Sequence, residues 1–230
     1  MPGSPALGEV VRIGTQALFP VVPPFLPDGP DVLVYADGTI YTPTRVVFDT
    51  APWAWPYEVG HASPSDLVDL FATADRLGLL APGEVLLPRI GVSDAPVTQL
   101  TFTTTAGAFG HRIEALNSPP ADDTTGYYAR IKEFAGALTG LADRARDPSG
   151  DFYAATAFAV VSAPIDADVF TASDWPGSTP LADLTSCQVL DDPALVDLFA
   201  GGAAGGGAFA DMGVIYSIAV ATAFPGQSTC

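Results

Sequence analysis

The two histidines, His61 and His111, are the side chains best suited to proton transfer near neutral pH. A hydrolytic triad also needs a nucleophile and an orienting carboxylate within reach of the histidine. His111 has Arg112 and Glu114 close by, but the chain holds no Gly-x-Ser-x-Gly motif and no spacing connects a serine to either histidine. A secreted hydrolase with an unfamiliar site is therefore one hypothesis, and non-catalytic histidines are the alternative.

Glu58 is the glutamate whose surroundings most resemble a sugar site, because Trp53, Trp55 and Tyr57 precede it. Glycoside hydrolysis uses a pair of carboxylates, and aromatic faces stack on carbohydrate rings. The alternative is structural, since the same aromatic side chains can cover the edge of a sheet. Glu58 is thus a second candidate for a hydrolytic site.

Asp147 and Asp151 bring two carboxylates close together around the turn at residues 148–150. Calcium prefers several oxygen ligands from such loops, which makes a calcium-stabilised module a third hypothesis. Two further acidic groups are Asp166, Asp168 and Asp174, and Asp191 with Asp192. None of them fits the EF-hand pattern, and aspartate is also the ordinary residue of turns and N-caps. No cofactor is expected.

The only two cysteines are Cys187 and Cys230. A disulfide between them ties down a C-terminal strand and, for a loop of about 40 residues, contributes roughly 3–4 kcal/mol in the chain-entropy model. Such a bond implies an oxidising compartment. Two free thiols in a reducing cytosol are the alternative.

The charge balance excludes several partners. With 26 acidic and nine basic residues, the chain has a net charge of −17. It repels a nucleic-acid backbone and an anionic membrane surface alike. Acidic surface residues ordinarily keep a secreted protein soluble, and a cationic partner or a bound cation is the more specific interpretation.

No run of 18 apolar residues occurs, so no transmembrane segment is expected. The first residues, Met-Pro-Gly-Ser-Pro-Ala-Leu-Gly, lack the basic and apolar regions of a signal peptide. We expect a trimmed mature form whose membrane contact, if any, depends on a lipid anchor absent from this chain.

Local patterns predict two hairpins. Asp37-Gly38 stands between the β-prone residues 32–35 and 39–41, a pattern typical of a type I′ turn. Residues 98–104 alternate in polarity and are followed by a turn at Ala106-Gly107 and a return strand over 109–116. Later strands are predicted over 153–161, 187–190 and 214–224.

Three helices are predicted from caps and apolar stripes. Ser63, Pro64 and Asp66 form a capping box, and this helix ends near Gly78. A second helix follows the acidic and hydroxyl residues 122–125 and ends near residues 144–146, where arginines suit the helix dipole. A third begins at residues 191–193 and stops at the glycine-rich run 201–207, which we expect to be a mobile loop.

The sequence Leu-Val-Asp-Leu-Phe-Ala occurs twice, at residues 67–72 and at residues 195–200. The match is either a coincidence among common residues or the mark of repeated strand–strand–helix units. We therefore predict an α+β fold, with a mainly antiparallel sheet built from strand–strand–helix units and about three helices packed on it. Residues 1–8 are expected to be a flexible lead-in, and residues 9–230 a single domain.

Several segments together resemble secreted proteins and lipoproteins of high-GC actinobacteria. The resemblance is carried by Leu33-Val34-Tyr35-Ala36-Asp37-Gly38-Thr39, the aromatic run and helix after it, the Leu100-Thr101-Phe102 hairpin, and the ending Phe224-Pro225-Gly226 before Cys230. The family has no assigned activity, so the resemblance implies no catalytic residue. It implies export and a Cys187–Cys230 pair. The chain departs from the pattern in lacking a signal segment and a lipid-bearing cysteine at its start.

These observations favour a non-enzymatic extracellular or cell-envelope protein that binds a protein partner. The expected contact residues are Trp53, Trp55, Tyr57, Trp175 and the loop 201–207. The hydrolase and the calcium-stabilised module remain the alternatives.

Overall fold

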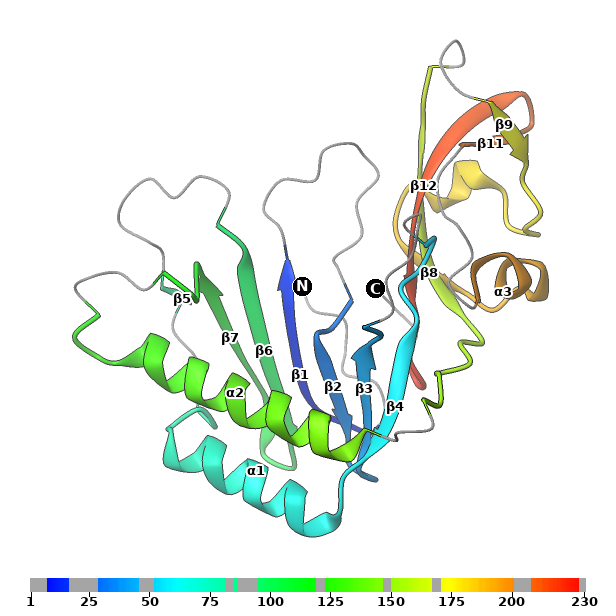
Figure 1. The fold of residues 1–230 in the computed structure, drawn as a ribbon. Coiled ribbons are helices and arrows are strands. Elements are labelled where there is room, and N and C mark those ends of the chain that lie inside the picture. Colours follow the sequence, from blue (N-terminus) through cyan, green and yellow to red (C-terminus); the bar gives the residue numbers. More distant parts are fainter. Residues whose placement is uncertain are drawn as a thin grey trace.

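The computed structural model describes residues 8–16, 29–45, 52–81, 85–86, 95–118, 123–146, 150–166, 171–200 and 208–227. Within these ranges the chain forms two mostly antiparallel sheets and three α-helices, so the predicted α+β class is confirmed. The strands divide between two sheets that lie at an angle to each other (Figure 1).

The first sheet has seven strands in the spatial order β4-β3-β2-β1-β6-β7-β5. The strands are β1 (Glu9–Gln16), β2 (Val32–Tyr35), β3 (Thr39–Pro43), β4 (Tyr57–His61), β5 (Val85–Leu86), β6 (Val97–Thr104) and β7 (Gly107–Glu114). All neighbouring pairs are antiparallel except β5 and β7. Both predicted hairpins, β2–β3 and β6–β7, are present.

The β2–β3 turn differs from the type I′ turn predicted for Asp37-Gly38. Gly38 has φ +91° whereas Asp37 does not enter the left-handed region, and the Gly38 N–H donates to the Tyr35 carbonyl at 3.0 Å. The Asp37 carboxylate accepts from the Thr39 N–H at 2.9 Å. This side-chain bond stabilises a local turn at Asp37, so only Gly38 has to adopt a positive φ.

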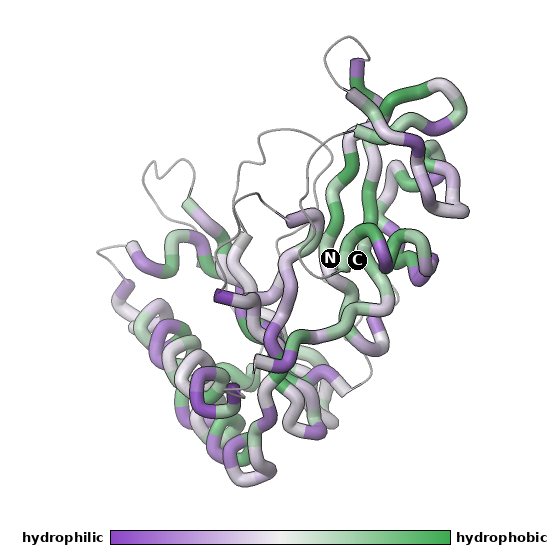
Figure 2. Tube along the Cα trace, turned by 45° about the vertical axis from the view of Figure 1, so that its right-hand side comes forward, coloured by the Kyte–Doolittle hydropathy of each residue, from purple (hydrophilic) through white to green (hydrophobic). Residues whose placement is uncertain are grey.

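Two helices, α1 (Pro64–Arg76) and α2 (Tyr127–Ala145), cover one face of the first sheet (Figure 1). The predicted capping box of α1 is confirmed, because the Ser63 hydroxyl accepts from the Asp66 N–H and the Asp66 carboxylate accepts from the Ser63 N–H. At α2 the Asp123 carboxylate accepts from the N–H groups of Tyr127 and Tyr128. Hydrophilic residues lie on the outer sides of both helices (Figure 2).

Between these helices and the sheet lies the larger apolar core. Its fully buried members include Val34, Leu100, Phe102, Ile113, Ile131, Phe134 and Leu138. They come from alternate positions on the strands and from one stripe of α2, which is the pattern that burial of a single face requires.

The second sheet has five strands in the order β10-β8-β12-β11-β9. They are β8 (Phe158–Pro164), β9 (Ala172–Asp174), β10 (Gln188–Leu190), β11 (Ala208–Asp211) and β12 (Val214–Thr222). The 3₁₀-helix η2 (Leu181–Leu184) and the helix α3 (Pro193–Phe199) pack on it around a separate core. The predicted strands over 187–190 and 214–224 correspond to β10 and β12.

The strand predicted from Tyr153 begins only at Phe158. The Tyr153 N–H donates to the Tyr57 carbonyl at 2.7 Å, and the Val59 N–H donates to the Asp151 carbonyl at 3.0 Å. Residues 151–153 therefore run along the outer edge of β4 before the chain crosses to the second sheet. This pairing with a distant strand overrides the local β-propensity of residues 153–157.

The two sheets meet at a group of side chains that we call the inter-sheet cluster. Its members are Leu33, Tyr35, Tyr41, Tyr57, Tyr153 and Phe224. The Phe224 ring lies 4.8 Å from the Tyr57 ring and 5.2 Å from the Tyr41 ring, measured between centroids. The chain that leaves β12 thus packs on the face of the first sheet that α1 and α2 leave uncovered.

None of the described helices combines the length and the apolar composition of a membrane-crossing segment.

Candidate functional site

His111 is a buried structural residue with an exposed fraction of 2%. Its Nε2 lies 2.7 Å from the Leu79 carbonyl oxygen and its Nδ1 lies 2.6 Å from the Tyr127 hydroxyl. Since a carbonyl can only accept, Nε2 carries the proton and Nδ1 accepts from Tyr127. Burial lowers the pKa of His111. Both ring nitrogens are engaged in holding β7 to α2 and to the segment after α1, and neither faces a carboxylate.

His61 ends β4 opposite Thr39 and is exposed to solvent. The alternation of β4 places it on the face that carries Tyr57 and Val59, opposite the face of His111. Hydrogen bonds from Thr39 lower the pKa of Asp37, and the nearby charge of His61 lowers it further. The structure does not bring the two histidines together, so they do not form one site.

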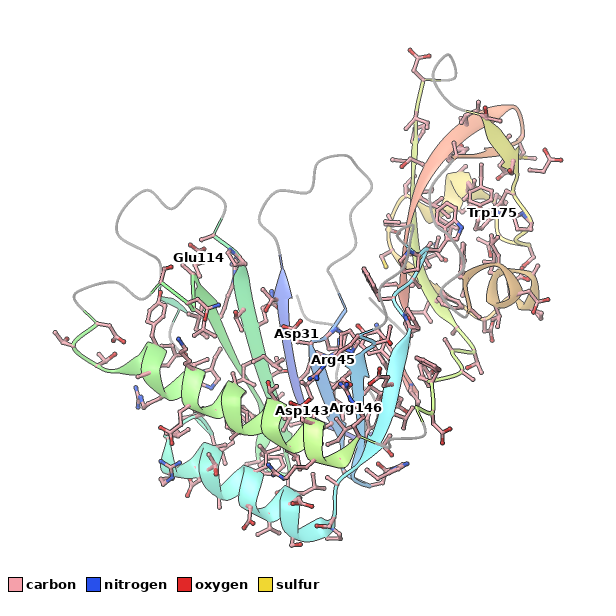
Figure 3. The ribbon with its side chains drawn as sticks, viewed as in Figure 1. Asp31, Arg45, Glu114, Asp143, Arg146 and Trp175 are labelled. Carbon is pink, nitrogen blue, oxygen red and sulfur yellow. The ribbon has the colours of Figure 1, made fainter. Side chains whose placement is uncertain are left out.

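Glu58 is bound by cationic and hydroxyl partners. Its Oε2 lies 2.8 Å from Arg146 Nε, and its Oε1 accepts from the Thr44 hydroxyl at 3.1 Å. Arg146 follows the last turn of α2 (Figure 3), so this ion pair fixes the end of the helix to β4. The carboxylate and the ring of Tyr57 come from adjacent residues of a strand and point to opposite faces.

Three of the four predicted aromatic contact residues are largely packed inside. Trp53 contacts Phe199 and Phe209 with ring centroids 5.8 and 5.5 Å apart, and Tyr57 belongs to the inter-sheet cluster. Trp175 lies against Phe209 and donates to the Thr179 carbonyl at 2.8 Å, on the side of the second sheet that α3 covers (Figure 3). Trp55 alone is exposed, with 52% of its surface accessible.

The predicted metal ligands are only partly described. Asp147 lies outside the described residues, as does the loop 201–207, while Asp151 accepts from the Val59 N–H through its main-chain carbonyl. Within the described ranges, no three histidine, cysteine, aspartate or glutamate side chains are grouped as metal ligands.

The described part of the chain has no free cysteine. The pairing of Cys187 with Cys230 stays a prediction, because Cys230 lies outside that part.

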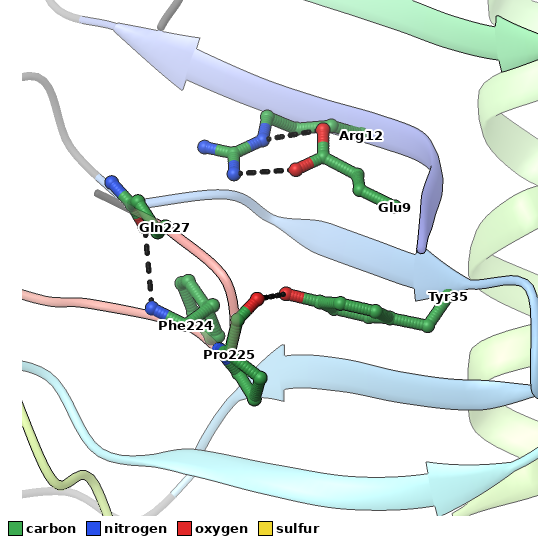
Figure 4. Close-up of polar contacts among 6 residues, drawn as sticks. All are labelled: Glu9, Arg12, Tyr35, Phe224, Pro225 and Gln227. Atoms are coloured by element: carbon green, nitrogen blue, oxygen red, sulfur yellow. Dashed lines mark hydrogen bonds and ion pairs between the residues drawn. The ribbon is translucent and has the colours of Figure 1, made fainter. Parts of the chain in front are cut away.

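The inter-sheet cluster borders an open depression of about 600 Å³. Tyr35 donates to the Pro225 carbonyl at 2.9 Å, beside the Glu9–Arg12 ion pair (Figure 4). Tyr153 donates to the Ala223 carbonyl at 3.1 Å, and burial raises its pKa to about 12. These hydroxyls stay protonated at neutral pH, and their hydrogen bonds connect the first sheet and its edge to the chain that leaves β12.

Asp191 is the single carboxylate among the described residues that line the depression. The other described walls are aliphatic, amide, hydroxyl and aromatic groups. Among the described residues of this lining, Asp191 has no second carboxylate, histidine or cysteine with which to form a proton-transfer pair.

The turn between β11 and β12 displays the most exposed large apolar side chain of the described residues. Asp211 pairs with Val214, so Met212 and Gly213 form a two-residue loop with φ values of +49° and +81°. Two consecutive positive φ angles define a type I′ turn, whose first position favours asparagine. Met212 is 90% exposed and Val214 is 42% exposed. Apolar residues continue from this tip down β12 (Figure 2).

No protein-family model, curated protein or solved structure matches this chain.

The sequence patterns predicted aromatic residues as the contact surface and did not identify Met212. The available signal was a methionine directly before glycine, between Asp211 and a β-prone run. Glycine marks the turn, and an apolar residue at its tip has no neighbours to pack against.

Proposed function

We propose that this protein is a non-enzymatic extracellular or cell-envelope protein that binds a protein partner through the tip of the β11–β12 hairpin. The observation that carries the proposal is Met212, a large apolar side chain held in water at a turn position unfavourable to it. A non-glycine residue in the left-handed region costs about 1–2 kcal/mol. Methionine side chains are flexible and polarisable, and they serve adaptable binding surfaces well.

The hairpin is held firmly behind this tip. The Asp211 carboxylate accepts from the Leu181 N–H at 2.7 Å, which joins the base of the turn to η2. The Phe209 ring is buried against Trp53 and Trp175. The backbone of such a hairpin loses little conformational freedom when the tip binds, which favours affinity for a partner.

Location outside the cytoplasm is part of the proposal. It is supported by the predicted disulfide, by the excess of acidic residues and by the resemblance to exported actinobacterial proteins.

The test is a crosslinking pull-down from the native cell envelope with the tagged wild-type chain and two variants. Met212→Asn removes the apolar tip but keeps a residue suited to a type I′ turn. Ala106→Asn makes the matched change at the exposed tip of the β6–β7 hairpin. We expect wild type and Ala106→Asn to recover the same partner, and Met212→Asn to recover at least about tenfold less, as for removal of a central apolar contact.

Met212→Asn is expected to melt at the wild-type temperature or above it, so misfolding will not explain a loss of binding. Equal recovery by all three proteins contradicts the proposed surface.

A further inference from the structure

The apolar tip lies in a part of the chain that carries only negative charge. All nine lysine and arginine residues and both histidines occur at or before Arg146, whereas ten of the 26 acidic residues follow it. These ten are all aspartates. The second sheet and its helices are therefore an acidic module, and the cations of the molecule belong to the first sheet, its helices and their connections.

Three of these aspartates surround the tip in the strand register. Asp211 pairs directly with Val214. Asp174 of β9 pairs with Ala210 of β11, on the adjacent strand. Asp166 comes directly after Ile165, whose N–H donates to the Ile215 carbonyl at 2.9 Å.

Asp166 and Asp174 are exposed, and Asp211 is half-buried. The tip thus presents an apolar centre with carboxylates at its margin. Interfaces commonly have this anatomy, in which an apolar anchor is desolvated and charged groups remain at a solvated rim.

Resting on the function proposed above, we infer that the hairpin tip inserts into an apolar pocket of a protein partner whose rim carries lysine or arginine. Opposite charges at a rim steer association and oppose wrong partners. A second copy of this chain would present the same carboxylates and a net charge of −17, so self-association through the tip is disfavoured. An anionic membrane surface is disfavoured for the same reason.

The experiment uses random peptides displayed on phage as the probe and the full chain, purified without reductant, as the target. Peptides that also bind Met212→Asn are removed first, which leaves binders that depend on the tip. We expect these peptides to combine apolar or aromatic residues with lysine or arginine. Their affinity is expected to fall about tenfold or more between about 0.05 and 0.5 M NaCl, because salt screens exposed charge pairs.

Two double variants distinguish the effect of the carboxylates beside the tip from the effect of the net charge of the whole chain. Asp166→Asn/Asp174→Asn removes the margin charges and is expected to weaken the selected peptides about three- to tenfold. Asp69→Asn/Asp75→Asn removes the same charge from exposed positions of α1 and is expected to leave their affinity unchanged.

The outcomes distinguish the two proposals. Absence of any tip-dependent peptide contradicts the proposed contact surface itself. Two results would keep the tip as a contact surface but overturn the basic rim of the partner. The tip-dependent peptides could be neutral or acidic, or they could bind Asp166→Asn/Asp174→Asn as tightly as they bind wild type. Met212-dependent binding to phosphatidylcholine vesicles, without basic peptides, assigns the tip to a lipid surface instead and also overturns it.

Discussion

The first and second sheets each carry a helix with the sequence Leu-Val-Asp-Leu-Phe-Ala, yet the two helices bury different members of it. In α3, Leu195 and Phe199 are fully buried. In α1, the residues at those positions, Leu67 and Phe71, are only partly buried.

The reason is the distance from the N-cap. Leu67 is the fourth residue of α1, whereas Leu195 is the third residue of α3. One residue rotates a helix by about 100°, so the same letters face different directions. A local sequence match therefore does not establish equivalent packing, and the start signal decides which face is buried.

The two sheets also differ in their hairpin turns. Gly38 in the first sheet is closed in, because a Cβ there would lie 2.3 Å from the Ala62 carbonyl oxygen. Gly213 in the second sheet has no described atom within 4 Å of such a Cβ. Both glycines have positive φ. An alanine at Gly213 would therefore meet backbone strain alone, whereas an alanine at Gly38 would meet the same strain and a steric clash as well.

The largest expected difference between the sheets concerns the repeated phenylalanine. Phe199→Ala should lower the free energy of unfolding by about 3–5 kcal/mol, because it removes a fully buried ring and leaves a cavity. Phe71→Ala should cost about 1–2 kcal/mol, since that ring is partly exposed. Urea denaturation measures both values, and equal losses would mean that the two copies pack equivalently after all.

The next largest difference concerns the hairpin glycines. Gly213→Ala should cost about 1 kcal/mol for the left-handed backbone alone. Gly38→Ala should cost about 2–4 kcal/mol, because the backbone near Ala62 must also move. Thermal melts of both variants test the difference, and a less stable Gly213→Ala protein would show that contact at Ala62 is relieved at little cost.

Acid should affect the first sheet before the second. The pKa of His111 is lowered in the folded state by burial, so below about pH 6.5 the unfolded chain takes up the proton more readily. The stability that depends on neutral His111 is present above that pH and is lost as the pH falls towards the folded-state pKa.

We expect hydrogen exchange at about pH 5.5 to quicken first in β7 and α2, and later in β8 and β12. The sequence after Arg146 holds no histidine that could act likewise. His111→Gln should remove this acid-dependent part. A variant that keeps the full pH dependence of wild type assigns the effect to other groups.

The smallest difference concerns the repeated valines. Val68 is exposed and Val196 is partly buried. Val68→Thr should change the free energy of unfolding by less than about 0.5 kcal/mol, whereas Val196→Thr should cost about 1 kcal/mol because it buries a hydroxyl. Equal effects in thermal melts would contradict the different orientation of the two helices.

Local rules predicted the elements whose signals lie within a few residues. The Ser63 capping box and the hairpin at Asp37-Gly38 are both present, since a side chain and the backbone beside it decide each of them. The turn type at Asp37 was wrong, because the Asp37 carboxylate binds the Thr39 N–H.

Contacts between distant residues were beyond such rules. Residues 151–153 pair with β4, and Glu58 binds Arg146 across a long stretch of chain. Neither is visible as a local pattern, so Tyr153 was predicted as the start of a strand and Glu58 as a candidate for a hydrolytic site. The short strand β11 was missed for a similar reason, since its four residues pair with β9 as well as with β12 and carry little local signal of their own.

The position of Phe224 in the inter-sheet cluster has a consequence for biosynthesis. Strands β2, β3 and β4 leave the ribosome before the second sheet is translated, and the ring that covers their aromatic face comes from a residue that follows that sheet. Until then Tyr41 and Tyr57 form an uncovered aromatic surface on the nascent chain, which chaperones and proteases can reach. A truncated product lacking residue 224 should therefore keep this aromatic surface exposed.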